Sequence, residues 1–307
     1  MMELNFKRLE AEDVRALSPY FSLRSNLTCD SVIFDSYLWR DYYQVEWALA
    51  ETAPAGDAAV LIRMREDDID FAALPVCSDE DLPGYFRVLE QYFEEELGQR
   101  LRVYGADEAG LAVLNLDPAR YEIRETPDAA DYIYDAESLR TLAGRKYHKK
   151  KNHVNAFLRA YADRWEYRRL TRAAKPEIWE FLERWEKTKG DEVEVHLDAE
   201  MQGLHDYLEN MDCFDAVTGG IYLDGTLEAF SVGSYNRLDR MSVVHVEKAN
   251  GEIRGLYTLM NQQFQIHEFP EAVLVNREDD VGLPSLRRAK ESYHPIQMAR
   301  KYQIIRR

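Results

Sequence analysis

The stretch that decides the fold runs from Met241 to Pro295 and reads MSVVHVEKANGEIRGLYTLMNQQFQIHEFPEAVLVNREDDVGLPSLRRAKESYHP. The run Ser242–Val246 is rich in β-branched residues, which favour a pleated strand. After a Gly–Glu turn, apolar residues recur at helical spacing over Ile253–His267 and predict a helix. The apolar run Ala272–Val275 is typical of a strand buried on both faces. The polar residues that follow it should lie at the sheet edge where ligands usually bind.

A basic segment in the middle divides the rest of the chain. Residues 138–163 contain no proline and predict one long helix, with GRKYHKKKNH at its centre. We therefore predict a first domain over residues 1–137, a connecting helix over residues 138–163 and a second domain over residues 164–307. Each domain shows the predicted order β-α-α-β-β-β-α-β-α. Tyr302–Ile305 is expected to close the second domain as a strand.

Turn and cap signals support this order. In the second domain, Ala216–Leu223 and Leu227–Tyr235 flank Asp224-Gly225, a turn whose backbone suits the twist of paired strands. In the first domain, a helix begins after Asp79–Asp81 and ends at Gly98. This element order is that of a GNAT (N-acetyltransferase-like) domain. The predicted fold class is α/β (α+β), with two tandem GNAT-like (acyl-CoA N-acyltransferase-like) domains joined by the long basic helix.

The composition limits the classes of function. Hydrophobic residues make up 46% of the 307 positions, which is enough for a sizeable core. The net charge of −17 argues against a general nucleic-acid coat, because phosphate would be repelled over most of the surface. Cys29, Cys77 and Cys213 form no CxxC pair, which favours a reducing compartment. Neither a secretory signal nor an apolar run of roughly 18 residues is visible, so we expect a cytoplasmic protein without stable membrane insertion.

The two predicted domains differ at the turn that leads into a central helix. Such a turn attracts anions, because the helix N-terminus carries free N–H groups and partial positive charge. In the first domain Asp79–Asp81 would repel phosphate, so we expect that domain to be structural. In the second domain two cations and two glycines leave room for a pyrophosphate or sugar phosphate. These candidate donor-binding residues are Lys248, Gly251, Arg254 and Gly255.

Three sequence blocks carry a resemblance to a known family. They are HVEKANGEIRGLYTLMNQQF (245–264), VNREDDVGLPSLRRAKESYHP (275–295) and GRKYHKKKNHVNAF (144–157). The blocks look like the signatures of an uncharacterised bacterial family similar to the C-terminal catalytic domain of phosphatidylglycerol lysyltransferases. More distantly, they resemble Fem-type peptidoglycan aminoacyltransferases. The resemblance implies tandem GNAT-like domains and acyl or aminoacyl transfer. The loop from Lys248 departs from the acetyltransferase pattern Gln/Arg-x-x-Gly-x-Gly/Ala, which weakens the case for acetyl-CoA.

Acyl transfer needs a base for the nucleophile and donors for the developing oxyanion. Strand alternation puts His245 and Glu247 on one face, and we expect Glu247 to be the base, with His245 as second choice. Backbone N–H groups near Val246 would hold the oxyanion. Tyr293 lies by the final helix, where GNAT enzymes often place a tyrosine general acid. In the alternative interpretation, Glu247 is a solvated surface charge and Tyr293 is a packing residue.

Asn276, Arg277 and Glu278 follow the buried strand and are the candidates for substrate binding. Arg277 could hold a phosphate or carboxylate through two hydrogen bonds, and Glu278 could orient an amine. A structural ion pair is an equally good interpretation. His148 and His153 are five residues apart and would point in different directions on a helix, so we predict no metal site.

The basic cluster of the central segment comprises Arg145, Lys146, Lys149, Lys150 and Lys151. Two like-charge i,i+4 pairs on one helix each cost a few tenths of a kcal/mol. An anionic partner would explain such crowding: a CoA phosphate, a tRNA acceptor stem or an anionic headgroup. We expect Lys146, Lys149 and Lys150 to assist donor binding. Neutralisation by acidic residues elsewhere in the chain is the alternative.

The sequence as a whole predicts an acyl or aminoacyl transferase. The acyl group would pass from an anionic carrier, an aminoacyl-tRNA or a CoA thioester, to an amine or hydroxyl acceptor. We expect no covalently bound cofactor. One alternative is a CoA-dependent N-acetyltransferase that acts on a small amine. The other is a non-catalytic ligand-binding protein of the same fold. The sequence assigns no oligomeric state.

Overall fold

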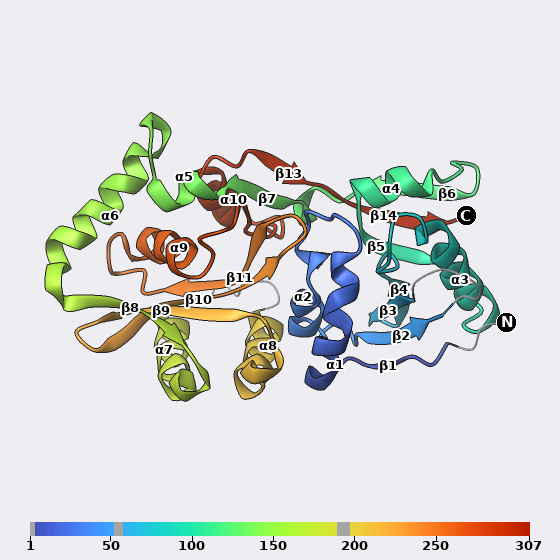
Figure 1. Cartoon of the computed structure of the whole chain (residues 1–307), viewed down its shortest axis with the longest axis horizontal. Coiled ribbons are helices and arrows are strands. Elements are labelled where there is room, and N and C mark those ends of the chain that lie inside the picture. The colour runs from blue at the N-terminus through green and yellow to red at the C-terminus, as the bar shows by residue number, and fades with distance from the viewer. Residues whose placement is uncertain (1–3, 52–57, 189–196) are drawn as a thin grey trace.

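The computed structural model describes residues 4–51, 58–188 and 197–307, which form two seven-stranded sheets with helices packed against them (Figure 1). In spatial order, the first sheet contains β1 (Lys7–Arg8), β2 (Glu46–Ala50), β3 (Ala59–Glu66), β4 (Ile69–Ala72), β5 (Arg102–Asp107), β14 (Lys301–Arg306) and β6 (Tyr121–Glu125). The second contains β13 (Gln297–Ala299), β7 (Asp131–Asp135), β12 (Leu274–Asn276), β11 (Met241–Ala249), β10 (Thr226–Asn236), β9 (Val217–Leu223) and β8 (Trp165–Leu170).

The two sheets share one pairing pattern. Each described sheet has a single parallel pair, β4–β5 in the first and β11–β12 in the second, and its other pairs are antiparallel. The helices are α1 (Ala11–Leu17), α2 (Ile33–Leu38), α3 (Leu82–Glu95), α4 (Glu108–Leu114), α5 (Ala136–Thr141), α6 (His148–Tyr161), α7 (Lys175–Thr188), α8 (Leu197–Glu209), α9 (Leu256–His267) and α10 (Pro284–Glu291). The fold is therefore mixed α+β.

One strand of each sheet comes from the other half of the chain. β7, from the end of the first half, pairs with β12 and β13 in the second sheet. β14, at the end of the second half, pairs with β5 and β6 in the first sheet. In Figure 1 the red β14 accordingly lies among teal strands and the green β7 among orange ones. The prediction that Tyr302–Ile305 closes the second domain is wrong, because these residues belong to the first sheet.

The central segment is two helices rather than one. α5 ends at Thr141; the C-cap residue Leu142 has a left-handed φ of 48°, and Gly144 has a φ of 90°. The chain re-enters a helix through the short 3₁₀ turn Arg145–Tyr147, and α6 follows. The prediction of a single long basic helix over residues 138–163 is therefore wrong. Leu142 is buried in the core around α9, and this packing outweighs the helical spacing of the sequence.

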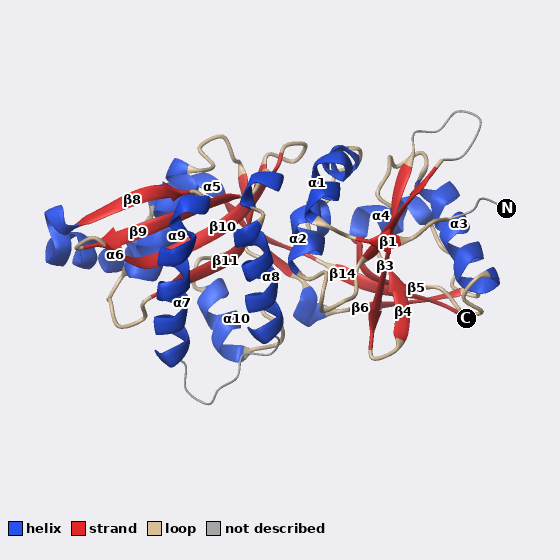
Figure 2. Cartoon of the chain, turned by 90° about the horizontal axis from the view of Figure 1, so that it is seen from below, coloured by secondary structure: helices blue, strands red, loops and turns tan. Residues whose placement is uncertain are grey.

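Aromatic packing joins the two halves between the sheets. Figure 2 shows α1 and α2 between them. Phe34 of α2 lies with its ring centroid 4.9 Å from that of Tyr207 in α8 and 5.4 Å from that of Phe214. These buried residues belong to one hydrophobic cluster that draws on both halves. Burial of a phenylalanine of this kind stabilises the joint by about 2 kcal/mol.

The predicted hairpin and the predicted helix of the second half are confirmed, and neither of them involves an exchanged strand. Asp224 and Gly225 have φ values of 51° and 82° and join β9 to β10 as a tight hairpin. The helix predicted over Ile253–His267 begins three residues later, as α9. Gly255, with a φ of 92°, forms its left-handed N-cap.

Candidate functional site

The site forms where β11 and β12 diverge. The two strands pair only from Met241–Leu274 to Val243–Asn276, so no described strand pairs with the later part of β11 on that side. Glu247 lies on this later part. One of its carboxylate oxygens accepts a hydrogen bond from Arg277 Nη2 at 3.0 Å, and the other accepts one from Asn261 Nδ2 at 3.0 Å. Glu247 is thus an ion-paired clamp that fixes the guanidinium of Arg277.

Arg277 and Lys150 share one aromatic ring. The ring centroid of Tyr293 lies 4.7 Å from the guanidinium carbon of Arg277 and 3.6 Å from Lys150 Nζ. Nη1 of Arg277 is buried, and no described residue forms a hydrogen bond to it. Burial and, to a smaller extent, the charge of Arg277 lower the pKa of Lys150 to about 8, against the opposing effect of Glu247. We call Lys150 and Arg277 the cation pair; it is suited to an anion or a developing oxyanion.

Tyr293 supports the cation pair as a buried platform. Its hydroxyl lies 3.5 Å from Thr258 Oγ1, and burial raises its pKa. Its backbone carbonyl accepts a hydrogen bond from the Tyr147 hydroxyl at 3.0 Å. This tyrosine therefore packs beside the site, and its predicted role as a general acid stays a prediction.

His245 lies two residues before Glu247 and is fully enclosed. Its Nδ1 is 2.8 Å from Glu278 Oε1, and its Nε2 is 3.1 Å from Ser234 Oγ. Burial lowers the pKa of His245 to about 4, although Asp35 and Asp131 favour the charged form. The imidazole is therefore neutral at neutral pH, and it links the carboxyl of Glu278 to strand β10.

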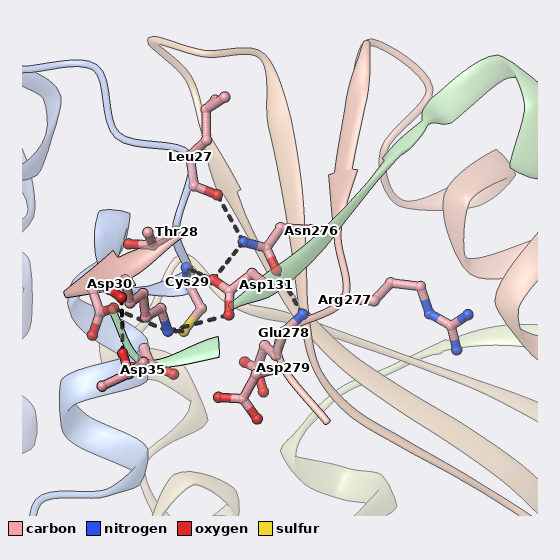
Figure 3. Close-up of polar contacts among 12 residues, drawn as sticks. Leu27, Thr28, Cys29, Asp30, Asp35, Asp131, Asn276, Arg277, Glu278 and Asp279 are labelled. Atoms are coloured by element: carbon pink, nitrogen blue, oxygen red, sulfur yellow. Dashed lines mark hydrogen bonds and ion pairs between the residues drawn. The ribbon is translucent and has the colours of Figure 1, made fainter. Parts of the chain in front are cut away.

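A second group of charges lies on the other side of β12 from Arg277. Figure 3 shows Arg277 pointing away from this group while Glu278 and Asp279 lie against it. We call it the carboxylate centre; its members are Cys29, Asp30, Asp35, Asp131, Glu278, Asp279 and Lys301. Lys301 Nζ lies 3.2 Å from Asp30 Oδ2, 3.2 Å from Asp131 Oδ1 and 3.1 Å from Cys29 Sγ. Lys301 thus serves as the counter-ion of the inner carboxylates.

The exchanged strands build the carboxylate centre. Asp131 comes from β7 and Lys301 from β14, while Asp35 comes from α2. Asp131 Oδ2 accepts hydrogen bonds from the Cys29 backbone N–H at 2.5 Å and from Asn276 Nδ2 at 3.0 Å. The predicted substrate-binding residue Asn276 is therefore fully buried and structural in its contacts.

Burial governs protonation in the carboxylate centre. It raises the pKa values of Asp35 and Glu278 well above their ordinary range. Burial opposes the charge of Lys301, but Asp131 and Asp30 outweigh it and raise the pKa of this lysine. Ligand atoms of Cys29, Asp35 and Glu278 lie within 4.8 Å of one another. Burial raises the pKa of the Cys29 thiol, so it stays protonated and is a poor metal ligand.

In the turn predicted to bind the donor phosphate, two of the four candidate residues already make contacts within the protein. β11 continues to Ala249, so Lys248 is a buried strand residue rather than a turn residue. Its Nζ donates to Glu200 Oε2 at 2.7 Å. A Cβ on Gly255 would lie 2.3 Å from the backbone oxygen of His153, so this glycine allows α9 to approach α6. Gly251 and Arg254 are exposed. Val246, the predicted oxyanion position, is buried and pairs with Val232 of β10.

The basic cluster lies at the start of α6. Arg145, Lys146, Lys149 and Lys151 are exposed, and Lys150 is half-buried. No side chain caps this helix end. Within the described ranges, no ion pair neutralises the four exposed cations. Cations at a helix N-terminus are unfavourable, because the partial positive charge of the helix repels them. The cluster is therefore a surface that gains from an external anion.

The comparisons with known proteins agree with this architecture. A family model described as "Phosphatidylglycerol lysyltransferase, C-terminal" matches residues 35–305. The chain belongs to this family. A conserved protein of unknown function from Bacteroides thetaiotaomicron has a similar structure, with a TM-score of 0.90 and 25% identity over 99% of this chain and 100% of that one. No helix in the described ranges is long and apolar enough to cross a membrane.

Two further solved structures show the same kind of fold. L-PGS from Bacillus licheniformis has a TM-score of 0.66 and 14% identity, over 98% of this chain and 94% of that one. A tandem GNAT protein from the clavulanic acid biosynthesis pathway has a TM-score of 0.50 and 12% identity, over 98% of both chains. The fold is thus GNAT-like, and the family and fold together place the chain among acyltransferases.

Proposed function

We propose that the protein is an aminoacyl transferase that moves an acyl group from an anionic carrier to an amine or hydroxyl acceptor. The observation that carries the proposal is the cation pair on Tyr293, which lies where β11 and β12 diverge and is continuous with the basic cluster through Lys150. Membership of the lysyltransferase family supports the class of reaction. We also propose that the two sheets are tandem GNAT-like units with exchanged strands.

The proposed roles follow from the contacts. Arg277 would stabilise the oxyanion that develops on the acyl carbonyl, because its Nη1 is free of hydrogen bonds from described residues and Glu247 fixes its plane. Lys150 would bind the carrier as a cation. Glu247 is less suited to be the base than predicted, because Arg277 and Asn261 already donate hydrogen bonds to its two carboxylate oxygens. Glu278 does not replace it, because this carboxyl faces the carboxylate centre on the other side of β12 from Arg277 and burial raises its pKa.

The bond changes are those of ordinary acyl transfer. The nucleophile forms a bond to the acyl carbon and loses a proton to water. The bond between that carbon and the carrier oxygen then breaks, and the departing oxygen takes up a proton. Negative charge develops on the carbonyl oxygen between these steps, and the guanidinium of Arg277 would lower the free energy of this charged intermediate.

The contacts favour aminoacyl-tRNA over CoA as the donor. A CoA pyrophosphate would need the turn before α9, where Lys248 is bound to Glu200 and Gly255 is packed against α6. The exposed cations at the start of α6, by contrast, remain available to a phosphate backbone. A CoA-dependent N-acetyltransferase is the second candidate, supported by the GNAT-like fold.

The test uses the full chain with three donor preparations: a pool of labelled aminoacyl-tRNAs, acetyl-CoA, and deacylated tRNA as a competitor. We expect loss of label from the tRNA pool, inhibition by deacylated tRNA and no turnover of acetyl-CoA. Arg168→Gln is a matched control, because Arg168 is exposed and paired with the neighbouring Glu166. Turnover of acetyl-CoA alone would replace the proposal with the second candidate. Turnover of neither would indicate a ligand-binding protein.

A further inference from the structure

The first half of the chain, expected to be structural, contains a cavity of about 110 Å³. It lies beside α2 where β4 and β5 diverge, since these strands pair only at Ala72–Val103. This is the position in the first sheet that corresponds to the divergence of β11 and β12 in the second. Among the residues that line it are Trp39, Tyr43, Tyr104, Asp30, Ser31 and Asp35. The cavity therefore adjoins the carboxylate centre.

The charge around this cavity is unbalanced. The carboxylate centre contains five carboxyl groups, and among the described lysines those of Lys301 and Lys290 lie against it. Lys301 is taken up by Asp30, Asp131 and Cys29, and Lys290 Nζ donates to the backbone carbonyls of Arg277 and Asp279. No described lysine or arginine forms an ion pair with Asp35. A further cation is needed for Asp35 to be charged at low cost.

Two more observations point to a ligand. Ser31 lines the cavity, is only 4% exposed, and its Oγ has no hydrogen-bond partner among the described residues. A buried hydroxyl without a partner is costly, and a ligand that donates or accepts there would remove the cost. The arginine of the cavity wall, Arg24, is already held by Asp107 through two hydrogen bonds of 2.9 and 2.7 Å. The wall therefore offers acceptors and aromatic faces rather than an anion site.

We propose that this cavity binds the primary ammonium group of a small amine, with Asp35 as its counter-ion, Ser31 as a hydrogen-bond partner and aromatic side chains around its apolar body. Aromatic faces attract cations, and carboxylates hold them by charge-assisted hydrogen bonds. A cavity of about 150 Å³ accepts benzene, so the present volume suits a short chain of a few carbons. Phosphate groups would be repelled by Asp30 and Asp35.

The proposal rests on the proposed transferase function and names one of its substrates as an amine. Asp35 Oδ1 lies 4.0 Å from His245 Nδ1, and Glu278 Oε1 lies 2.8 Å from the same atom, so the bound nitrogen would lie beside the His245–Glu278 pair. Two different molecules could carry this ammonium group. It belongs either to an acceptor amine, whose nitrogen loses a proton to water and then forms the new C–N bond, or to the transferred aminoacyl group itself.

Isothermal titration of the full chain with three isosteric probes tests the site without a donor. The probes are n-butylammonium, n-butanol and butyrate, which differ mainly in charge. We expect n-butylammonium to bind at least about tenfold more tightly than n-butanol, and butyrate not to bind, because Asp35 favours a cation. In Asp35→Asn the preference for the ammonium should disappear. Asp117→Asn, at an exposed position, is the matched control.

Thermal unfolding of both variants shows whether each is folded. Equal binding of n-butanol and n-butylammonium, or an unchanged preference in a folded Asp35→Asn, would overturn the amine site. In the transfer assay, formation of an acyl-butylamide identifies the acceptor as the source of the ammonium. Inhibition by n-butylammonium without acylation identifies the aminoacyl group. Amine binding without any transfer would overturn the proposed function alone, and transfer without amine binding would overturn the amine site alone.

Discussion

Arg277 and Glu278 are neighbours in sequence but belong to two regions of opposite character. Arg277 faces the cation pair, and Glu278 faces the carboxylate centre on the other side of β12. The cation pair is built almost entirely from the second half of the chain. The carboxylate centre needs residues from α2, β7 and β14, so it exists only because the halves exchange strands. The opposite surroundings of these two adjacent residues thus depend on the topology of both sheets.

The largest effect should come from removing the counter-ion of the carboxylate centre. In Lys301→Met, Asp131 stays buried without its cation, so the free energy of unfolding should fall by about 3–5 kcal/mol. Urea denaturation measures this change. In the control Arg164→Met, which breaks an exposed ion pair with Asp224, the loss should be about 1 kcal/mol or less. Equal losses in the two variants would show that Lys301 does not hold the centre together.

On the other side of β12, the main effect should be on catalysis. Arg277→Met should lower the single-turnover rate by about 10²- to 10³-fold, because the developing oxyanion loses its charged donor. The folded fraction can be checked by thermal unfolding, and the exposed Arg168→Gln should keep the full rate. An Arg277→Met variant with a normal rate would assign Arg277 to the structure alone.

The titration of Lys150 should make the activity of the cation pair depend on pH. Its lowered pKa of about 8 means that the ammonium loses its proton as pH rises through this value, and carrier binding then weakens. We expect kcat/KM, which reports the free enzyme, to fall by about tenfold between pH 8 and pH 10. Lys150→Arg should keep its charge and remove the fall. A fall of the same size in Lys150→Arg would place the titrating group elsewhere.

The smallest effect should come from the exposed part of the basic cluster. The double variant Lys149→Gln/Lys151→Gln should weaken carrier binding by about threefold at low salt, and the difference should vanish at high salt. Lys187→Gln, at an exposed position on α7, is the control. Fluorescence anisotropy of labelled tRNA measures both. A difference that does not depend on salt would show that these lysines do not act through their charge.

The sequence predicts local structure well here and long-range structure poorly. Asp224-Gly225 specify their hairpin through the left-handed backbone of two adjacent residues. The helix α9 is specified by the helical spacing of its own apolar residues. The exchange of β7 and β14 has no local signal, because a strand that leaves its own sheet has the same pattern as one that stays. Asp35, Asp131 and Lys301 were missed for this reason: each meets its partners only after the exchange.

The candidate site was predicted in part. Arg277 and Glu278 follow the buried strand β12 as predicted, and His245 and Glu247 of β11 and Lys150 of the basic segment lie near them. Their roles could not be assigned from spacing, because the roles depend on contacts between segments. Lys248 shows the limit most clearly: the strand runs longer than its β-branched core, so the lysine lies inside it and pairs with Glu200.

A single-turnover reaction with one labelled aminoacyl-tRNA pool and one small amine decides whether this molecule transfers acyl groups from an anionic carrier. The wild-type chain should move label from tRNA to the amine, and Arg277→Met should do so at least about a hundredfold more slowly. Equal rates in both proteins, or no transfer by the wild type under conditions where it binds tRNA, would contradict the assignment.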